Sequence, residues 1–234
     1  MLNNLFSDEN PLIRGLTMIC DIAILSVIWL VSIIPVFTFG AATTALYYTV
    51  VKVFRRKKGY VFEEYKRSFK ENFKEATILW LIFLLLFVLC GFNIYLSFGW
   101  ITVMIGEQFG RLLMGIYMAV FLILFGTMLY MFPVLSRFVL SKTQLVKMSL
   151  ALSFRHFLHT IALFVLALIS IVLGIHFFMT FPLLFLFAPG AFTLLISFVM
   201  EHVLKKYMPE DAWDDDKKTE QEIEYEEMLE NESN

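Results

Sequence analysis

Within its first long uncharged run the chain reads Ile34-Pro35-Val36-Phe37-Thr38-Phe39-Gly40-Ala41-Ala42-Thr43-Thr44-Ala45-Leu46-Tyr47-Tyr48. The proline predicts a kink or an end of the preceding helix, because it lacks an N–H donor and restricts the residue before it. The small residues that follow let helix backbones approach closely, and threonine hydroxyls can bond carbonyls that a break frees. Residues 41–55 are therefore predicted to form a short second helix, either re-entrant or lying at the membrane surface.

Seven residues of this stretch are the candidates for a functional or packing motif: Pro35, Thr38, Gly40, Thr43, Thr44, Tyr47 and Tyr48. Structural packing is the favoured interpretation, and a ligand site lined by backbone is the alternative. Asn93 is the deepest strongly polar side chain of a later uncharged run. It is the candidate for a polar contact, either a hydrogen bond between helices or a contact with a ligand.

Hydrophobic residues make up 59% of the 234-residue chain, and its mean hydropathy is +0.74. Soluble domains are only about 45–50% apolar, so this chain has too little polar surface to cover a globule in water. The sequence therefore predicts an all-α, polytopic membrane protein embedded in the lipid bilayer. We expect about five transmembrane helices, together with amphipathic helices at the membrane surface.

Uncharged runs place the spans, because a hydrocarbon core of about 30 Å needs about 20 helical residues. The predicted spans are residues 17–38, 77–98, 112–135, 158–179 and 183–201, with a turn at Pro182 between the last two. Residues 1–207 form the predicted membrane domain. Residues 208–234 are rich in Glu and Asp and are predicted to be a disordered cytoplasmic tail.

Basic residues are concentrated in two of the connections. Nine of the 19 Lys and Arg residues lie between Lys52 and Lys74, and four more lie in 137–156, whereas 99–111 holds only Arg111. Since basic loops stay in the cytoplasm, the N-terminus is predicted outside and the C-terminus inside. Topology accounts for these charges, so nucleic-acid binding is not expected. Glu107 and Arg111 lie four apart and are expected to pair.

Residues 60–76 carry aromatic residues at helical spacing, with charged residues at most other positions. They predict an amphipathic helix at the headgroup level that precedes a turn into the bilayer. A helix packed on the other loops is the alternative. A weak repeat relates Ser68-Phe69-Lys70 to Ser153-Phe154-Arg155, and Pro35-Val36-Phe37-Thr38 to Pro133-Val134-Leu135-Ser136. Chance similarity is the rival explanation in so biased a composition.

Side chains able to carry chemistry are few. His156 and His159 lie one helical turn apart, but no carboxylate or thiol near them in the sequence completes a metal site. Cys20 and Cys90 have neither a metal-ligand nor a disulfide-framework spacing. No paired carboxylates and no nucleophile with a base stand out. The sequence therefore predicts a non-enzymatic protein with no cofactor and no metal.

The stretch from Pro35 to Tyr48 resembles the YesL family of uncharacterised bacterial membrane proteins. Gly59-Tyr60 and Ser68-Phe69-Lys70-Glu71-Asn72-Phe73-Lys74-Glu75-Ala76-Thr77 reinforce the resemblance, which covers residues 1 to about 207. It implies a multi-pass protein of the bacterial plasma membrane. Members of the family tend to be encoded beside carbohydrate ABC importers and sensor kinases, which implies a link to sugar uptake. The resemblance supplies no catalytic residues.

Two functions are compatible with these features. The first is an accessory protein that binds a sugar ABC permease or its sensor kinase. The alternative is a small transporter or channel for an uncharged or lipid-like solute. It would be built as a homo-oligomer and lined by Thr38, Thr43, Thr44 and Asn93.

Overall fold

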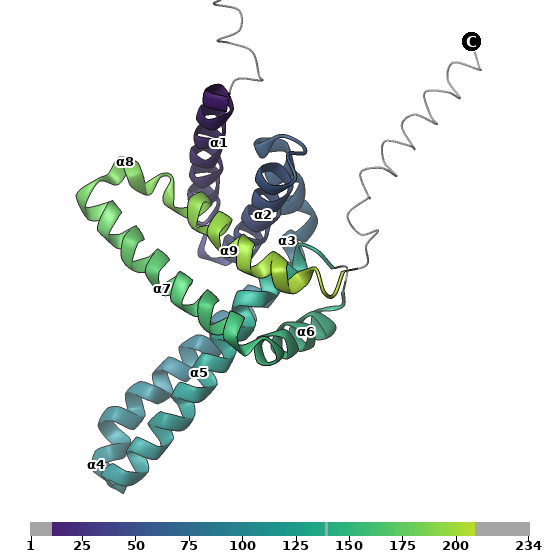
Figure 1. Cartoon of the computed structure of the whole chain (residues 1–234). Helices are drawn as coiled ribbons and strands as arrows, with labels where there is room; N and C mark the ends of the chain where they lie inside the picture. Colours follow the sequence, from purple (N-terminus) through teal and green to yellow (C-terminus); the bar gives the residue numbers. More distant parts are fainter. Residues whose placement is uncertain (1–10, 139, 209–234) are drawn as a thin grey trace, which may run out of the picture. The chain divides into compact units, whose positions relative to one another are not determined.

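The computed structural model describes residues 11–138 and 140–208, and within these ranges every regular element is a helix. The chain divides into two compact units, residues 1–200 and 201–234. From residue 209 onwards, the predicted tail lies outside the described residues. The elements, with helices labelled as in Figure 1, are α1 (Pro11–Ser32), η2 (Val36–Thr38), α2 (Phe39–Thr49), η3 (Val50–Arg55), α3 (Val61–Leu96), η4 (Ser97–Ile101), α4 (Thr102–Ile105), α5 (Glu107–Leu135), α6 (Lys142–Arg155), α7 (Phe157–Thr180), α8 (Pro182–Phe185) and α9 (Ala188–Leu204).

The predicted all-helical membrane architecture is confirmed. Five helical segments are long and apolar enough to cross a membrane: Gly15–Ser32, Val36–Arg55, Val61–Gly99, Glu107–Leu135 and Phe157–Thr180. Four of them overlap predicted spans, and Val36–Arg55 contains the predicted short second helix. The predicted span 183–201 is divided between α8 and α9, and α9 has 17 residues.

The first helix ends earlier than the predicted span 17–38. α1 stops at Ser32, and Pro35 adopts an extended conformation with φ −76° and ψ 108° before the chain resumes as η2. The hydroxyl of Thr38 lies 2.5 Å from the carbonyl oxygen of Ser32 and 2.6 Å from that of Pro35. The single hydroxyl hydrogen of Thr38 is therefore within reach of the carbonyl that ends α1 and of the carbonyl of the proline itself.

α2 is the most enclosed helix of the first unit. Eight of its 11 residues are buried, and its main packing partner is α3. Leu46 and Val50 join Leu25 of α1 and Tyr65 of α3 in one apolar cluster. The small side chains at the start of α2 permit this burial, because they leave room for the backbones of neighbouring helices.

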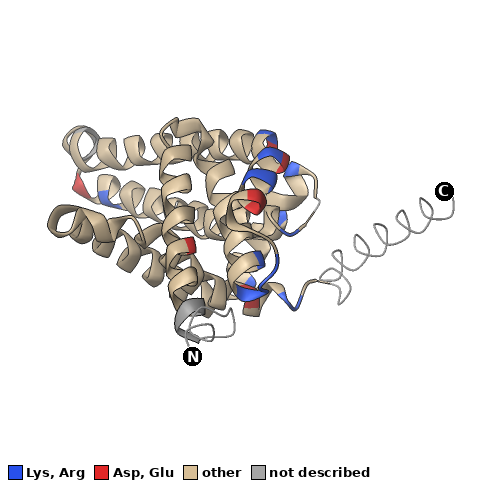
Figure 2. Cartoon of the chain, turned by 90° about the horizontal axis from the view of Figure 1, so that it is seen from above, with Lys and Arg blue, Asp and Glu red and all other residues tan. Residues whose placement is uncertain are grey.

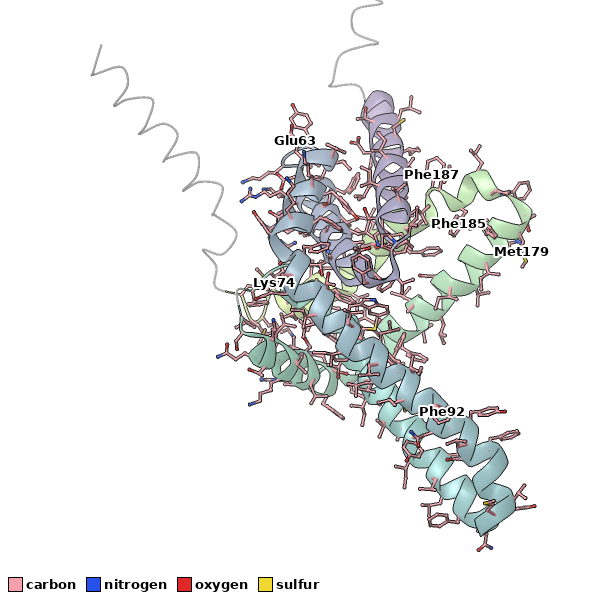
Figure 3. The ribbon with its side chains drawn as sticks, turned by 180° about the vertical axis from the view of Figure 1, so that it is seen from behind. Glu63, Lys74, Phe92, Met179, Phe185 and Phe187 are labelled. Carbon is pink, nitrogen blue, oxygen red and sulfur yellow. The ribbon has the colours of Figure 1, made fainter. Side chains whose placement is uncertain are left out.

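α3 is one unbroken helix of 36 residues. It contains both the predicted amphipathic helix 60–76 and the predicted span 77–98, so no loop separates the two. Figure 3 shows α3 changing direction near Lys74, between its labelled residues Glu63 and Phe92. The expected turn into the bilayer is therefore a bend within a continuous helix.

Beyond the bend, α3 and α5 run side by side as a hairpin closed by η4 and α4 (Figure 1). The Cys90 sulfur lies 3.1 Å from the carbonyl oxygen of Tyr117, and the ring centroids of Phe87 and Phe121 are 5.2 Å apart. These contacts join α3 to α5 far from the end of the helices where most basic residues lie. Figure 2 shows Lys and Arg gathered mainly at that basic end.

α6 and α7 are separated at His156, whose backbone angles of φ −111° and ψ 48° end the first helix. α7 then contacts α5 near its own start, where the hydroxyls of Thr160 and Tyr130 are 3.1 Å apart and the rings of Phe164 and Phe125 pack edge to face. Figure 1 shows α7 and α5 separating beyond these contacts. At its far end α7 packs against α8, where the ring centroids of Phe178 and Phe185 are 5.5 Å apart. Between these two contact regions most of its side chains are exposed.

The two similar segments that begin at Pro35 and Pro133 share one kind of hydrogen bond. The hydroxyl of Ser136 donates to the carbonyl of Pro133 at 2.7 Å, as the hydroxyl of Thr38 does to the carbonyl of Pro35. Pro133 lies inside the last turn of α5, whereas Pro35 follows the end of α1. The similarity is thus local, and the helices around the two prolines differ.

Candidate functional site

Gly40 brings α2 into direct contact with α3. A Cβ atom at residue 40 would lie 2.5 Å from the carbonyl oxygen of Ala76 and 2.8 Å from the Cβ atom of Trp80. Contacts this short are not tolerated, so a hydrogen atom is the only side chain that fits between the two helices. Gly40 of the candidate motif therefore permits a close approach between α2 and α3.

Phe39, the neighbour of Gly40, links three other helices. Its ring centroid lies 6.2 Å from that of Trp29 on α1, 4.5 Å from that of Trp80 on α3 and 6.4 Å from that of Phe132 on α5. The indole N–H of Trp80 also donates to the carbonyl of Val36 at 2.8 Å. Aromatic pairs in these orientations are each worth about 0.5–1.5 kcal/mol beyond their burial.

The hydroxyl groups of the motif are used locally. Thr44 donates to the carbonyl of Gly40 at 2.9 Å, within its own helix. The hydroxyl oxygen of Thr43 is buried without a hydrogen-bond partner among the described residues. Tyr47 is 2% exposed, whereas Pro35 lies at the surface. Thr38 and Thr44 therefore support the backbone of η2 and α2, whereas Thr43 makes no such bond.

Asn93 does not make the predicted bond between helices. Its side-chain amide donates to the carbonyl of Leu89 at 2.8 Å, one turn earlier in α3 itself. In a helix, the carbonyl four residues earlier lies within reach of an asparagine side chain. The Asn93 amide therefore has a hydrogen-bond partner without a second helix. Asn93 also lies about 20 Å along α3 from Trp80, at 1.5 Å per residue. The structure therefore does not bring it to the threonines near Gly40.

A cluster of basic and aromatic side chains closes the other end of the motif. The Tyr48 ring centroid lies 5.8 Å from the Lys52 ammonium nitrogen and 5.8 Å from the guanidinium carbon of Arg137, which follows α5. Lys52 also pairs with Glu64 of α3 at 3.1 Å, and each of the two side chains is only 12% exposed. The cluster therefore ties η3, the start of α3 and the end of α5 together.

The loop before α3 is shaped around this ion pair. Gly59 has a φ of +75°, and a Cβ atom there would lie 2.5 Å from a carboxylate oxygen of Glu64. Glycine adopts this left-handed conformation without strain and leaves room for the carboxylate. The Gly59-Tyr60 pair of the sequence thus has a definite structural role.

Arg55 ends η3, a segment with π-helical hydrogen bonds, and reaches α9. Its guanidinium donates to the carbonyl of Ser197 at 2.5 Å and lies 4.6 Å from the ring centroid of Phe198. Segments of π-helix occur often at functional sites because they redirect side chains. Here the side chain is the Arg55 guanidinium, which links η3 to α9.

A pocket of about 280 Å³ lies near the hairpin end of α3 and α5. It is lined by Ser97, Phe98, Glu107, Gly110, Arg111 and Met114. The predicted pairing of Glu107 with Arg111 is present at 3.1 Å, with side chains 71% and 67% exposed. The pair is open to solvent and the rest of the lining is largely apolar, so the pocket offers few fixed polar contacts.

The histidine pair forms a ring contact. The rings of His156 and His159 meet edge to face with centroids 5.7 Å apart. Across the parts of the chain that the structure describes, no group of three or more His, Cys, Asp or Glu side chains is placed to hold a metal ion.

Sequence reasoning missed three residues that organise this region: Phe39, Trp80 and Arg137. Phe39 lies inside the quoted stretch, and an aromatic residue directly beside the small-residue run was the available signal. The parts played by Trp80 and Arg137 depend on packing between segments far apart in the sequence, which no local pattern reveals.

Residues 22–94 match the family described as protein of unknown function, DUF624. The matched segment runs from α1 to near the end of α3 and contains the Gly40–Ala76 contact and the Lys52–Glu64 ion pair. No curated protein and no solved structure matches the chain. The match covers about a third of the chain, and the DUF624 family includes the YesL-like bacterial membrane proteins, so it agrees with the resemblance of the stretch from Pro35 to Tyr48.

Proposed function

We propose that the protein is a non-enzymatic accessory subunit that binds another integral membrane protein. The observation that carries this proposal is the exposure of α7. Of its 24 residues only Leu163 and Gly174 are buried. Such a helix meets lipid or a neighbouring protein along most of its length, and helices in a bilayer associate through packing and hydrogen bonds.

The two segments α2 and α7 differ in how much of each is buried. In the most apolar 18-residue window of each segment, 67% of the residues of Val36–Arg55 are buried, against 6% of those of α7. The enclosed segment stabilises the fold, whereas α7 is free to present its surface. Its exposed residues include Ile169 and Val172, which are apolar, and His176, which offers a hydrogen-bonding ring. A partner helix able to bond an imidazole suits this surface better than acyl chains do.

The partner class follows from the family resemblance. YesL-like proteins tend to be encoded beside carbohydrate ABC importers and sensor kinases, so a sugar permease or its sensor is the partner that we propose. Both are integral membrane proteins and both present transmembrane helices to a neighbour. No reaction is assigned to the protein in this role.

Site-specific photo-crosslinking in native membranes tests the proposal. A benzophenone amino acid at Val172, which is 64% exposed, is expected to crosslink to a permease or kinase subunit. The same probe at Ile116 of α5, which is 51% exposed, is the matched control for contact with lipid alone. Crosslinks to protein from neither position, or equally from both, would contradict a docking role for α7.

We also propose a location and an orientation. The protein lies in the bacterial plasma membrane, with its N-terminus outside and its C-terminus in the cytoplasm. The gathering of Lys and Arg at one end of the helices supports this orientation (Figure 2), because basic segments stay on the cytoplasmic side.

A further inference from the structure

The first half of α3 carries an exposed face made of aromatic and lysine side chains. At 100° per residue, Phe62, Phe69 and Phe73 lie within about 40° of one another around the helix axis. Phe62 is 60% exposed and Phe73 is 38% exposed, while Phe69 is half-buried. The three rings thus form a narrow apolar stripe on the surface of this part of the helix.

Lysine side chains flank the stripe on one side. Around the axis, Lys66, Lys70 and Lys74 lie about 40°, 80° and 120° from Phe62. All three are exposed. The Lys66 ammonium nitrogen lies 6.0 Å from the ring centroid of Phe62. We call the stripe and its flank the Phe–Lys face, defined by Phe62, Lys66, Phe69, Lys70, Phe73 and Lys74.

Most of the acids of the same helix segment lie on the far side. Glu64, Glu71 and Glu75 are about half a turn away from Phe62 around the axis. Glu71 pairs there with Arg67 at 3.0 Å, and Glu64 pairs with Lys52. Glu63 is the exception, because it lies between Lys70 and Lys74 around the axis. The segment therefore separates cations from most of its anions, as a helix lying on a charged surface does.

The side of the segment next to the stripe packs into the protein. Tyr65 and Ala76 lie within about 60° of Phe62 around the axis, yet Tyr65 is 3% exposed and Ala76 is fully buried. Burial inside the fold explains Tyr65 and Ala76. It does not explain why Phe62 and Phe73 point outward next to lysines.

α6 repeats this arrangement in the second half of the chain. Ser68 and Ser153 are both buried, and each precedes a phenylalanine and a basic residue. On α6, Phe154 is 59% exposed and Arg155 lies at the surface. In both helices a buried serine therefore precedes an exposed basic residue, and the intervening phenylalanine is exposed on α6 and half-buried on α3.

We propose that the Phe–Lys face of α3 binds the headgroup region of anionic lipid. The phenylalanine rings sit at the boundary between headgroups and acyl chains, and the lysine ammonium groups reach the lipid phosphates. A lysine near an anionic surface contributes about a fivefold preference for it, so three of them make the face selective for anionic over zwitterionic lipid. The bend of α3 near Lys74 lets this segment leave the direction of the transmembrane part (Figure 3). This inference does not depend on the accessory role.

Fluorescence quenching in nanodiscs tests the proposal with the full-length protein. A nitrobenzoxadiazole label is placed on Phe73→Cys, or on Glu71→Cys as the control on the acidic side, in a chain whose Cys20 and Cys90 are replaced. The discs contain phosphatidylcholine with a minor fraction of brominated phosphatidylglycerol. The label at residue 73 is expected to be quenched at least about twice as strongly as the label at residue 71, because only the former reaches the acyl boundary.

Charge variants separate anion recognition from simple contact with lipid. Replacing Lys66, Lys70 and Lys74 together by Gln is expected to abolish the excess quenching by brominated phosphatidylglycerol over brominated phosphatidylcholine, while replacing all three by Arg keeps it. Equal quenching at residues 71 and 73 would overturn the proposal. Unchanged selectivity in the Gln variant would also overturn it. The same holds for a label at residue 73 that is not quenched by lipid but is shielded when an acidic protein is added.

Discussion

The backbone of Gly40 on α2 lies against the carbonyl group of Ala76 on α3, with no room for a Cβ atom between them. Ala76 stands where the exposed Phe–Lys segment passes into the transmembrane part of α3. The contact therefore fixes α2 at the point where α3 changes direction. Trp80, one turn further along α3, also lies against this glycine, and its ring packs against Phe39 with centroids 4.5 Å apart.

Gly40→Ala is expected to destabilise the protein by about 1–3 kcal/mol, since the added methyl group forces α2 and α3 apart. Thermal unfolding in detergent, followed by intrinsic fluorescence, measures the loss. Gly91→Ala is the matched control, because a Cβ atom at residue 91 of α3 meets nothing within 4 Å. It should change stability by less than about 1 kcal/mol, on the stabilising side. Equal effects at both positions would remove the close contact as the cause.

Glu64→Gln is expected to weaken the fold by about 1–3 kcal/mol, because it leaves the mostly buried Lys52 ammonium group without its carboxylate partner. Glu71→Gln breaks the Arg67–Glu71 pair, whose side chains are 61% and 58% exposed. An exposed pair of this kind is worth at most about 0.5 kcal/mol. Chemical denaturation of both variants in the same detergent compares them. A larger effect at residue 71 than at residue 64 would contradict this assignment.

The sequence allowed the membrane class, the helical fold and the break at Pro35 to be predicted, because each depends on local composition and backbone chemistry. α2 is buried, and its small residues leave room for its neighbours. The unbroken course of α3 was not predicted, although its sequence permits it. Hydropathy changes at residue 76, whereas the hydrogen-bonded backbone continues through it, since no proline or glycine lies between Val61 and Cys90.

The candidate site was less predictable than the fold. Gly40 and Thr38 were identified because their residue types suit a tight contact and a helix break. Asn93 was assigned an interhelical role from its depth alone, and the structure shows that its amide bonds to the carbonyl of Leu89. The partners of Tyr48 come from three segments, and Arg137 lies 89 positions beyond it in the chain. Only the folded arrangement brings such residues together.

Thr38→Val is expected to cost about 1–2 kcal/mol, because it preserves shape and removes the hydroxyl that serves the carbonyls of Ser32 and Pro35. Thr38→Ser keeps the hydroxyl and should retain most of the stability. Unfolding midpoints of the two variants measure the difference. If Thr38→Ser lost more than Thr38→Val, packing of the methyl group and not the hydrogen bond would be the main contribution.

Cysteine labelling in intact cells checks the orientation. In a chain whose Cys20 and Cys90 are replaced, Lys70→Cys is expected to resist a membrane-impermeant maleimide until the cells are opened, because the basic end of the helices faces the cytoplasm. Gln108→Cys, at the opposite end of the α3–α5 hairpin, should react in intact cells. Both positions are exposed, so access through the fold does not distinguish them. Labelling of residue 70 from outside would reverse the orientation and would place the Phe–Lys face on the wrong leaflet for the anionic lipids of the cytoplasmic surface.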